Sequence, residues 1–219
     1  MSISKNVWSD NFTEAEILMV RKTYYAMCAE TDYLLGQVYN LAQATGHLKN
    51  TYTIFVSDHG EMNMEHRQVW KNSLYEPSAR VPLIISGPGV AQGKVVSDTL
   101  VSLLDIYPTL VDMVGGSPPA YLDGHSLMPL LNPSHPRSVG ASADAAARPD
   151  FITAQYHSNM GNTGSFMIRQ GDWKYIVYGT ALKAFAGYKP QLFNVATDPD
   201  EQVQVILTYS SPTPPLLLP

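Results

Sequence analysis

The sequence predicts an α/β fold in layers, followed by a small antiparallel sheet. One observation is a long amphipathic segment at residues 13–45, and a second is a pair of β-branched runs at residues 51–57 and 81–86. The third is a set of closely spaced strand-like runs at residues 151–156, 165–169 and 173–178. A long helix that alternates with buried strands is typical of layered α/β domains. Short strands between turn residues are typical of antiparallel sheets.

The first helix has a clear beginning and a clear end. Thr13 and Glu16 form a capping-box pattern, and Gly46 is a natural helix stop. Mostly apolar side chains then recur at steps of three and four residues, at Ile17, Val20, Tyr24, Met27, Thr31, Leu34, Val38 and Leu41. The single cysteine, Cys28, falls inside this helix, and we expect it to be a small buried residue.

Between the two β-branched runs lies a long irregular segment, residues 58–80, called the excursion below. Functional groups concentrate in such loops of α/β folds. After the second run, residues 98–114 predict another helix, which Pro108 could kink.

The chain divides into four parts by composition. Residues 1–131 contain the helix and strand signals of the α/β part. Residues 132–150 are rich in Pro and Ala and predict a low-complexity insertion. Residues 151–201 hold the small antiparallel sheet, and residues 202–219 form a Pro/Leu-rich tail.

Composition restricts the class of protein. With 45% hydrophobic and 15% charged residues, the chain should bury a core. A net charge of −5 gives no electrostatic reason to expect nucleic acid or an anionic membrane as partner. No apolar run is long enough to span a bilayer, and the first residues lack the hydrophobic segment of a signal peptide. One cysteine cannot form a disulfide within the chain.

Polar side chains follow the first predicted strand directly. Asp58 and His59 come after the run that ends at residue 57, and ligands bind at the carboxyl ends of strands in open α/β sheets. The pair could hold a metal ion, or it could be a polar turn in which Gly60 reverses the chain. Lys71, in the same excursion, could neutralise charge on an anionic ester or be a solvated surface charge. Together these residues favour a site for an anionic ester.

Other charged side chains allow weaker predictions. His66, at the rim of the excursion, could assist a leaving group or cap a turn. We expect Glu61 and Glu65 to be structural or solvated, Lys174 to be exposed on its strand, and Asp105 to hold the second helix in place.

Residues 54–83 read IFVSDHGEMNMEHRQVWKNSLYEPSARVPL. This block resembles the sulfatases of the alkaline-phosphatase superfamily, which have a strand, an Asp-Asn or Asp-His-Gly turn, a Lys before a Tyr-Glu pair, and Val-Pro. The resemblance extends over residues 12–201 and is strongest to the arylsulfatase K branch. Further segments that match this branch are Tyr24–Asp32, Glu65–Arg67, Val101–Pro108, Trp173–Ile176 and Gln191–Phe193.

The resemblance implies a fold, a reaction and a site. The fold would be part of the alkaline-phosphatase-like sandwich with its small C-terminal sheet, and the reaction would be hydrolysis of a sulfuric ester. Asp58 and His59 would help to hold a calcium ion, with the other ligands outside this chain. Lys71 would bind the sulfate, and His157 would reach the substrate from the small sheet, unless it is a satisfied turn histidine.

The resemblance also implies the partners and the compartment. The substrate would be a sulfated small molecule or a sulfated glycosaminoglycan uronate. The full-length family member would be lysosomal or secreted.

One family feature is missing from the sequence. The nucleophile of these sulfatases is a formylglycine made from a Cys-x-Pro/Ala-Ser-Arg motif, whereas Cys28 lies in Met-Cys-Ala-Glu-Thr. We therefore expect the chain to be the C-terminal portion of a sulfatase and to be inactive by itself. Two alternatives stay open: a phosphonate or phosphodiester hydrolase of the same superfamily, and a non-catalytic product.

Overall fold

The computed structural model describes residues 12–136, 148–157, 163–180 and 189–205. The helices are α1 (Glu14–Ala44), α2 (Glu76–Ala79), α3 (Ile106–Met113) and α4 (Met128–Leu131), with 3₁₀ turns η2 (His47–Asn50), η3 (Glu65–Arg67) and η4 (Leu103–Asp105). The strands are β1 (Thr53–Val56), β2 (Met62–Asn63), β3 (Val69–Trp70), β4 (Leu83–Ser86), β5 (Phe151–His157), β6 (Thr163–Gln170), β7 (Trp173–Thr180) and β8 (Gln191–Asn194). None of the helices in these ranges is both long enough and apolar enough to cross a membrane.

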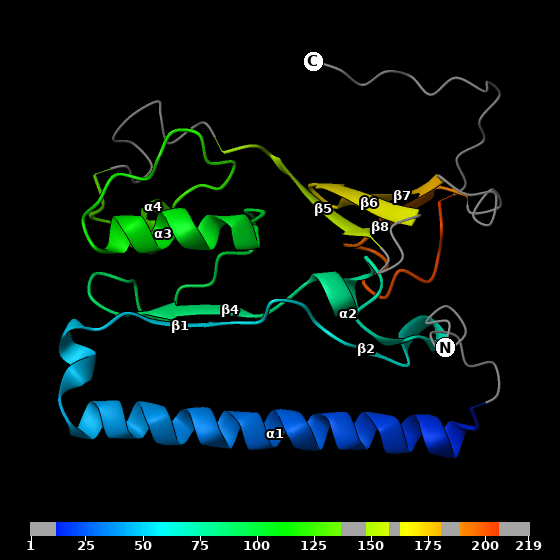
Figure 1. Ribbon diagram of the computed structural model, residues 1–219, viewed down its shortest axis with the longest axis horizontal. Helices are drawn as coiled ribbons and strands as arrows, with labels where there is room; N and C mark the ends of the chain where they lie inside the picture. The colour runs from blue at the N-terminus through cyan, green and yellow to red at the C-terminus, as the bar shows by residue number, and fades with distance from the viewer. Residues whose placement is uncertain (1–11, 137–147, 158–162, 181–188, 206–219) are drawn as a thin grey trace.

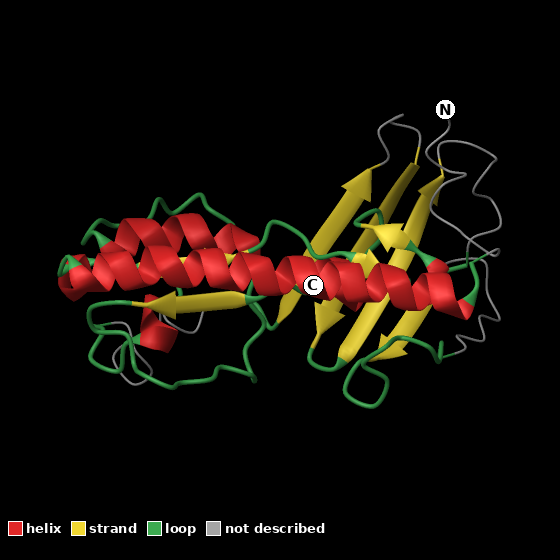
Figure 2. Cartoon of the chain, turned by 90° about the horizontal axis from the view of Figure 1, so that it is seen from below, coloured by secondary structure: helices red, strands yellow, loops and turns green. Residues whose placement is uncertain are grey.

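The elements form layers, as the sequence predicts. Strands β1 and β4 make a two-stranded ribbon, with α1 on one side and α3 and α4 on the other (Figure 1). The sheet β5–β8 lies at the other end of the molecule, next to α2. Seen from below, α1 runs along the length of the described chain (Figure 2). The predicted α/β class with a small antiparallel sheet is confirmed.

Helix α1 begins with the capping box that the sequence predicts. The Thr13 hydroxyl accepts the Glu16 N–H at 3.3 Å, and the Glu16 carboxylate accepts the Thr13 N–H at 2.8 Å. The expectation for Cys28 is wrong, because this residue is exposed. No residue of α1 is buried, since the ribbon and the β2–β3 hairpin cover only part of its surface. Its most exposed apolar residues are Met19, Tyr25, Met27, Tyr33, Val38 and Leu41.

The ribbon is antiparallel, with Thr53 opposite Ser86 and Val56 opposite Leu83. The carboxyl end of β1 therefore lies beside the beginning of β4. The excursion leaves the ribbon at this end and returns to it, and it folds into the β2–β3 hairpin, η3 and α2.

The C-terminal sheet has the order β5-β6-β7-β8, with every neighbouring pair antiparallel. Three of its strands were predicted, and β8 was not, because four residues give too short a pattern. One face of this sheet packs on the excursion and forms the main apolar core. The buried members of this core are Met62, Leu74, Tyr75, Met167, Ile176, Phe193 and Val195.

The second predicted helix is shorter than residues 98–114. It starts at η4, where Ser102 and Asp105 form a second capping box, and α3 ends at Met113. Pro108 lies in the first turn of α3, where a missing N–H costs little, so the helix continues through it.

Asp105 holds this helix in place, as predicted. Its side chain is buried, accepts the His125 N–H at 2.7 Å, and pairs with Arg148 at 2.8 Å. Arg148 belongs to the predicted insertion 132–150, so this end of the insertion is attached to the α/β part. Residues 137–147 of the insertion and residues 206–219 of the tail lie outside the described residues.

Candidate functional site

The turn after β1 packs closely on α2. The Gly60 N–H donates to the Ser78 carbonyl at 2.8 Å. A Cβ atom at position 60 would lie 2.0 Å from the Pro77 carbonyl oxygen, so only glycine fits there. Asp58 and His59 therefore lie on a turn whose backbone is held by α2.

The His59 ring is oriented by its own turn. Its Nδ1 lies 2.8 Å from the Gly60 carbonyl oxygen, which can only accept, so Nδ1 carries the proton. In the neutral ring this leaves the lone pair on Nε2, which lies 3.5 Å from Oδ2 of the exposed Asp58 carboxylate. A carboxylate oxygen and a ring nitrogen with a free lone pair thus lie side by side next to solvent.

This pair fits the edge of a metal site. Calcium takes six to eight ligands, mostly oxygens. Asp58 and His59 supply at most three donor atoms. Within the described ranges no group of three or more His, Cys, Asp or Glu residues could hold a metal. A calcium ion bound here would need ligands from other residues, and its binding stays a prediction.

Lys71 is connected to the same turn through Ser78. Lys71 is exposed, and its carbonyl accepts the Ser78 hydroxyl at 2.8 Å. Ser78 is buried in α2, and its own carbonyl accepts the Gly60 N–H. One serine therefore ties the backbone of Lys71 to the backbone of the turn with Asp58 and His59. The structure brings these three predicted site residues onto neighbouring segments.

His66 lies at the contact between the excursion and the C-terminal segment. Its ring stacks on Tyr75 with 4.0 Å between centroids, and its Nε2 is 3.1 Å from the Asp200 carbonyl oxygen. Both contacts are structural. A role for His66 near a leaving group stays a prediction.

His157 lies on the face of the sheet that points away from the excursion. Side chains of β5 alternate, and Ala154 and Tyr156 pack on the core while His157 is exposed. The His157 ring meets Phe166 edge to face at 5.4 Å, above Gly164. Because Lys71 is carried by the segment on the other face, the placement of His157 does not support a contact with the same substrate.

The two glutamates of the excursion are structural, as expected. Glu61 accepts the Trp70 N–H at 2.7 Å, and Glu65 accepts the Asn63 N–H. Both hold the β2–β3 hairpin, which precedes Lys71.

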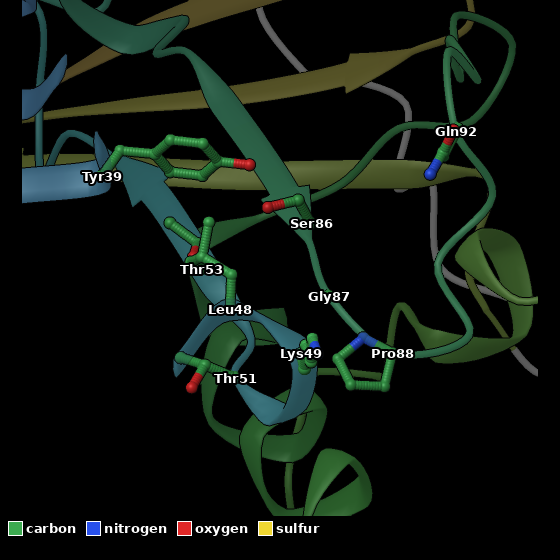
Figure 3. A pocket seen from close by; sticks show the side chains of 9 residues that line it. All are labelled: Tyr39, Leu48, Lys49, Thr51, Thr53, Ser86, Gly87, Pro88 and Gln92. Atoms are coloured by element: carbon green, nitrogen blue, oxygen red, sulfur yellow. The ribbon is translucent and has the colours of Figure 1, made fainter. Parts of the chain in front are cut away.

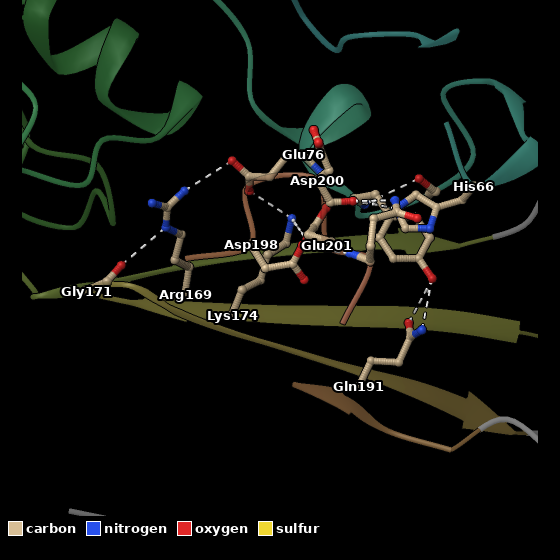
Figure 4. Close-up of polar contacts among 12 residues, drawn as sticks. His66, Glu76, Arg169, Gly171, Lys174, Gln191, Asp198, Asp200 and Glu201 are labelled. Atoms are coloured by element: carbon tan, nitrogen blue, oxygen red, sulfur yellow. Dashed lines mark hydrogen bonds and ion pairs between the residues drawn. The ribbon is translucent and has the colours of Figure 1, made fainter. Parts of the chain in front are cut away.

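A buried ion network was missed in the sequence. The expectation for Lys174 is wrong, because it is 0% exposed. Its Nζ lies 2.9 Å from Glu76 and 2.8 Å from Glu201, and Arg169 reaches Glu76 at 3.3 Å (Figure 4). The contact between Lys174 and Oε1 of Glu201 is an ion pair without hydrogen-bond alignment.

Burial raises the pKa of Glu201, and the nearby Lys174 ammonium opposes that shift. The alternation of side chains along β7 could have revealed this burial. Lys174 lies two positions before the core residue Ile176 and therefore faces the same side of the strand.

Two hollows lie elsewhere on the surface. A polar one of about 270 Å³ opens where β1 begins and β4 ends, lined by Thr53, Ser86 and Lys49 among others (Figure 3). It is at the opposite end of the ribbon from Asp58. An apolar one of about 440 Å³ lies between α1 and the β2–β3 hairpin and includes Trp70. Neither hollow includes Asp58, His59 or Lys71.

Residues 4–116 match the sequence model of the sulfatase family. This chain belongs to the sulfatase family. Residues 64–211 also match a model described as N-sulphoglucosamine sulphohydrolase, C-terminal. Among its relatives, arylsulfatase K of Xenopus laevis is 42% identical over 194 residues, which is 89% of this chain and 35% of the relative. Arylsulfatase K of Danio rerio is 44% identical over 200 residues, 91% of this chain and 36% of the relative.

Solved structures show the same family fold. A phosphonate monoester hydrolase of Agrobacterium radiobacter superposes with a TM-score of 0.70 at 29% identity, over 89% of this chain and 38% of that chain. A 2-O GAG sulfatase superposes with a TM-score of 0.60 at 30% identity, over 71% of this chain and 32% of that chain. This sulfatase-family chain thus spans a little more than a third of the length of the curated relatives it matches.

Proposed function

We propose that this chain supplies the sulfate-binding side of the active site of a sulfuric ester hydrolase. The observation that supports this most directly is Ser78, which ties the turn with Asp58 and His59 to the backbone of Lys71 through two hydrogen bonds of 2.8 Å. A carboxylate, an imidazole and an ammonium on adjoining segments suit an anionic ester with a bound cation. Membership of the sulfatase family supports the sulfate ester in particular.

Each of these residues has a distinct role in the proposal. The Asp58 carboxylate and His59 Nε2 would hold a calcium ion together with ligands from other residues. When bound, such a cation polarises the sulfate ester. The Lys71 ammonium would stabilise the negative charge that grows on the sulfate in the transition state. The hydrogen bond from His59 to the Gly60 carbonyl would keep Nε2 free for the metal.

The proposed substrate is a sulfated saccharide, such as a sulfated glycosaminoglycan uronate. Two similar structures support this class: a 2-O GAG sulfatase, and a protein solved in complex with D-glucosamine-2-N,6-O-disulfate, which superposes with a TM-score of 0.64 at 25% identity. A phosphonate monoester hydrolase is the less favoured alternative. Its 29% identity is well below the 42% and 44% of the arylsulfatase K relatives.

The test uses a hybrid enzyme in which this chain replaces the matching part of the arylsulfatase K of Danio rerio. Hydrolysis of an aryl sulfate is measured over a range of calcium concentrations. Lys71→Ala should lower kcat by about 100- to 1,000-fold with the calcium dependence nearly unchanged. Asp58→Ala should raise the calcium requirement at least about 10-fold, because the hard cation loses an anionic ligand.

Lys94→Gln is the matched control, because the Lys94 ammonium contacts only the Leu130 carbonyl on the surface among the described residues. Its activity should equal that of the parent hybrid. Full activity in both Lys71→Ala and Asp58→Ala would refute the proposed roles. Faster hydrolysis of a phosphonate monoester than of the sulfate would favour the alternative.

A further inference from the structure

The segment before Lys71 has an unusual backbone. Met64, His66, Arg67 and Trp70 all have positive φ angles, of 73°, 49°, 56° and 71°. Residues other than glycine are strained in this region, and they remain there only when surrounding contacts enforce it. Four such residues within seven positions therefore require supporting contacts, part of which Glu61 and Glu65 supply by accepting the Trp70 and Asn63 N–H groups.

Residues 198–201, near the C-terminal end of the described chain, contact this segment and the start of α2 that follows it. The Glu201 carboxylate accepts the N–H of Glu76, the first residue of α2, at 2.6 Å. The other Glu201 oxygen lies 2.8 Å from the Lys174 ammonium. Glu201 itself has a φ of 54°, so its own conformation is enforced as well. One residue earlier, the Asp200 carbonyl contacts His66.

The charges of the network balance one another, and its central groups are shielded from water. Lys174 lies between the carboxylates of Glu76 and Glu201, and Arg169 is the second cation. Two positive groups thus balance two negative groups. Glu201 and Lys174 have almost no exposed surface. Such a network allows little movement, because shifting any one member leaves a buried charge without its partner.

A continuous set of contacts leads from this network to Lys71. Glu201 holds the first residue of α2, and Ser78 in the same helix donates to the Lys71 carbonyl. We propose that Glu201 and Lys174 are positioning residues, which hold the Lys71 ammonium over the sulfate by fixing α2. The proposal rests on the proposed function for the role of Lys71, but the fixing of α2 is measurable without it.

The first experiment measures amide hydrogen exchange in the 219-residue chain and in its Glu201→Gln variant. Glutamine keeps the shape, but it loses the ion pair with Lys174, and its neutral amide oxygen accepts the Glu76 N–H less strongly than a carboxylate does. The amides of residues 71–76 and of Ser78 should exchange about tenfold faster, while those of β1 and β4 should not change. Lys94→Gln should leave both regions unchanged. Equal exchange at residues 71–78 in both proteins, or an equal acceleration everywhere, would overturn the proposal.

The second experiment separates positioning from general stabilisation, by kinetics in the hybrid enzyme. Glu201→Gln should lower kcat about tenfold with little change in KM, because the ammonium is displaced in the transition state. In a Lys71→Gln background the same substitution should change kcat by less than about twofold. An equal loss in both backgrounds would show a merely structural role.

The two experiments also separate the two proposals. Full activity of Lys71→Gln would refute the role of Lys71 and leave the exchange result standing. If the hybrid enzyme is inactive, the exchange experiment alone decides whether Glu201 fixes the segment of Lys71.

Discussion

Lys174 shows how strongly one residue can depend on its surroundings. Its ammonium is fully buried between two carboxylates that lie 98 and 27 positions away in the sequence. A lysine in this environment is costly unless both partners are in place. Its burial explains why α2 and the end of the described chain stay attached to the C-terminal sheet.

Removing the Lys174 ammonium should destabilise the fold strongly. Lys174→Met leaves Glu76 and Glu201 close together without the cation between them, and should cost about 3–5 kcal/mol of unfolding free energy. Glu201→Gln should cost less, because Lys174 keeps its contact with Glu76. The double variant should recover part of the loss, because the remaining Arg169–Glu76 pair is neutral overall.

Urea unfolding followed by circular dichroism measures these differences. Lys94→Met is the control and should change stability by less than about 0.5 kcal/mol. Additive losses in the double variant would show that the two residues do not interact.

A pair of glycines offers a second test at the residue scale. Gly60→Ala places a Cβ against the Pro77 carbonyl, which is backbone and cannot move aside, so the variant should be destabilised by more than about 1 kcal/mol. Gly36 lies in α1 with nothing within 4 Å of a new Cβ, so Gly36→Ala should stabilise the chain by about 0.5–1 kcal/mol. Urea unfolding followed by circular dichroism measures the change in stability of both variants. A Gly60→Ala variant as stable as the parent chain would contradict the close packing of the turn on α2.

At the scale of elements, helix α1 is the least covered. It has no buried residue, and many of its apolar side chains face solvent. Soluble monomers seldom expose apolar surface of this extent. The outer face of the C-terminal sheet also carries exposed apolar side chains, Phe151, Ile168 and Trp173.

We therefore expect the chain by itself to self-associate at micromolar concentration. Replacing Val38 and Leu41 of α1 with lysine should reduce this association, because charged groups keep apolar faces apart. The free energy of unfolding should change by less than about 0.5 kcal/mol per substitution, because neither side chain is buried. Sedimentation velocity measures the association. A parent chain that stays monomeric at micromolar concentration would refute the expectation.

At the scale of the whole molecule, the proposed function makes the candidate site one side of an active site. The chain offers the turn with Asp58 and His59, and it offers Lys71 on a segment fixed by a buried network. The resemblance to sulfatases implies that the nucleophile is a formylglycine, and the sequence around Cys28 does not match the motif from which it is made.

We accordingly expect no sulfatase turnover from the purified 219-residue chain. Without an activated nucleophile, electrostatic help from Lys71 cannot replace covalent chemistry. Hydrolysis of an aryl sulfate is the measurement, with the hybrid enzyme as positive control. Clear turnover by the chain that disappears in Lys71→Ala would contradict this expectation.

Much of the fold could be predicted because its signals are local. The capping box and the three- and four-residue periodicity of α1 depend on residues less than two turns apart. Strands β1, β4, β5, β6 and β7 follow from short apolar or alternating runs, and the turn with Asp58 and His59 follows from its position after β1. The place of Lys71 in the excursion after Asp58 and His59 drew attention to this exposed lysine, and the family resemblance supported its selection.

The remaining features were decided by tertiary structure, because they depend on residues far apart in the sequence. Glu201 meets Glu76 across 125 positions, and this contact made the buried Lys174 possible. Strand β8 exists through its pairing with β7, and the exposure of Cys28 depends on how much of α1 its neighbours cover. Local patterns determine which segments become helices or strands. Which charges are buried together, and which backbone holds Lys71, is settled only when those segments pack.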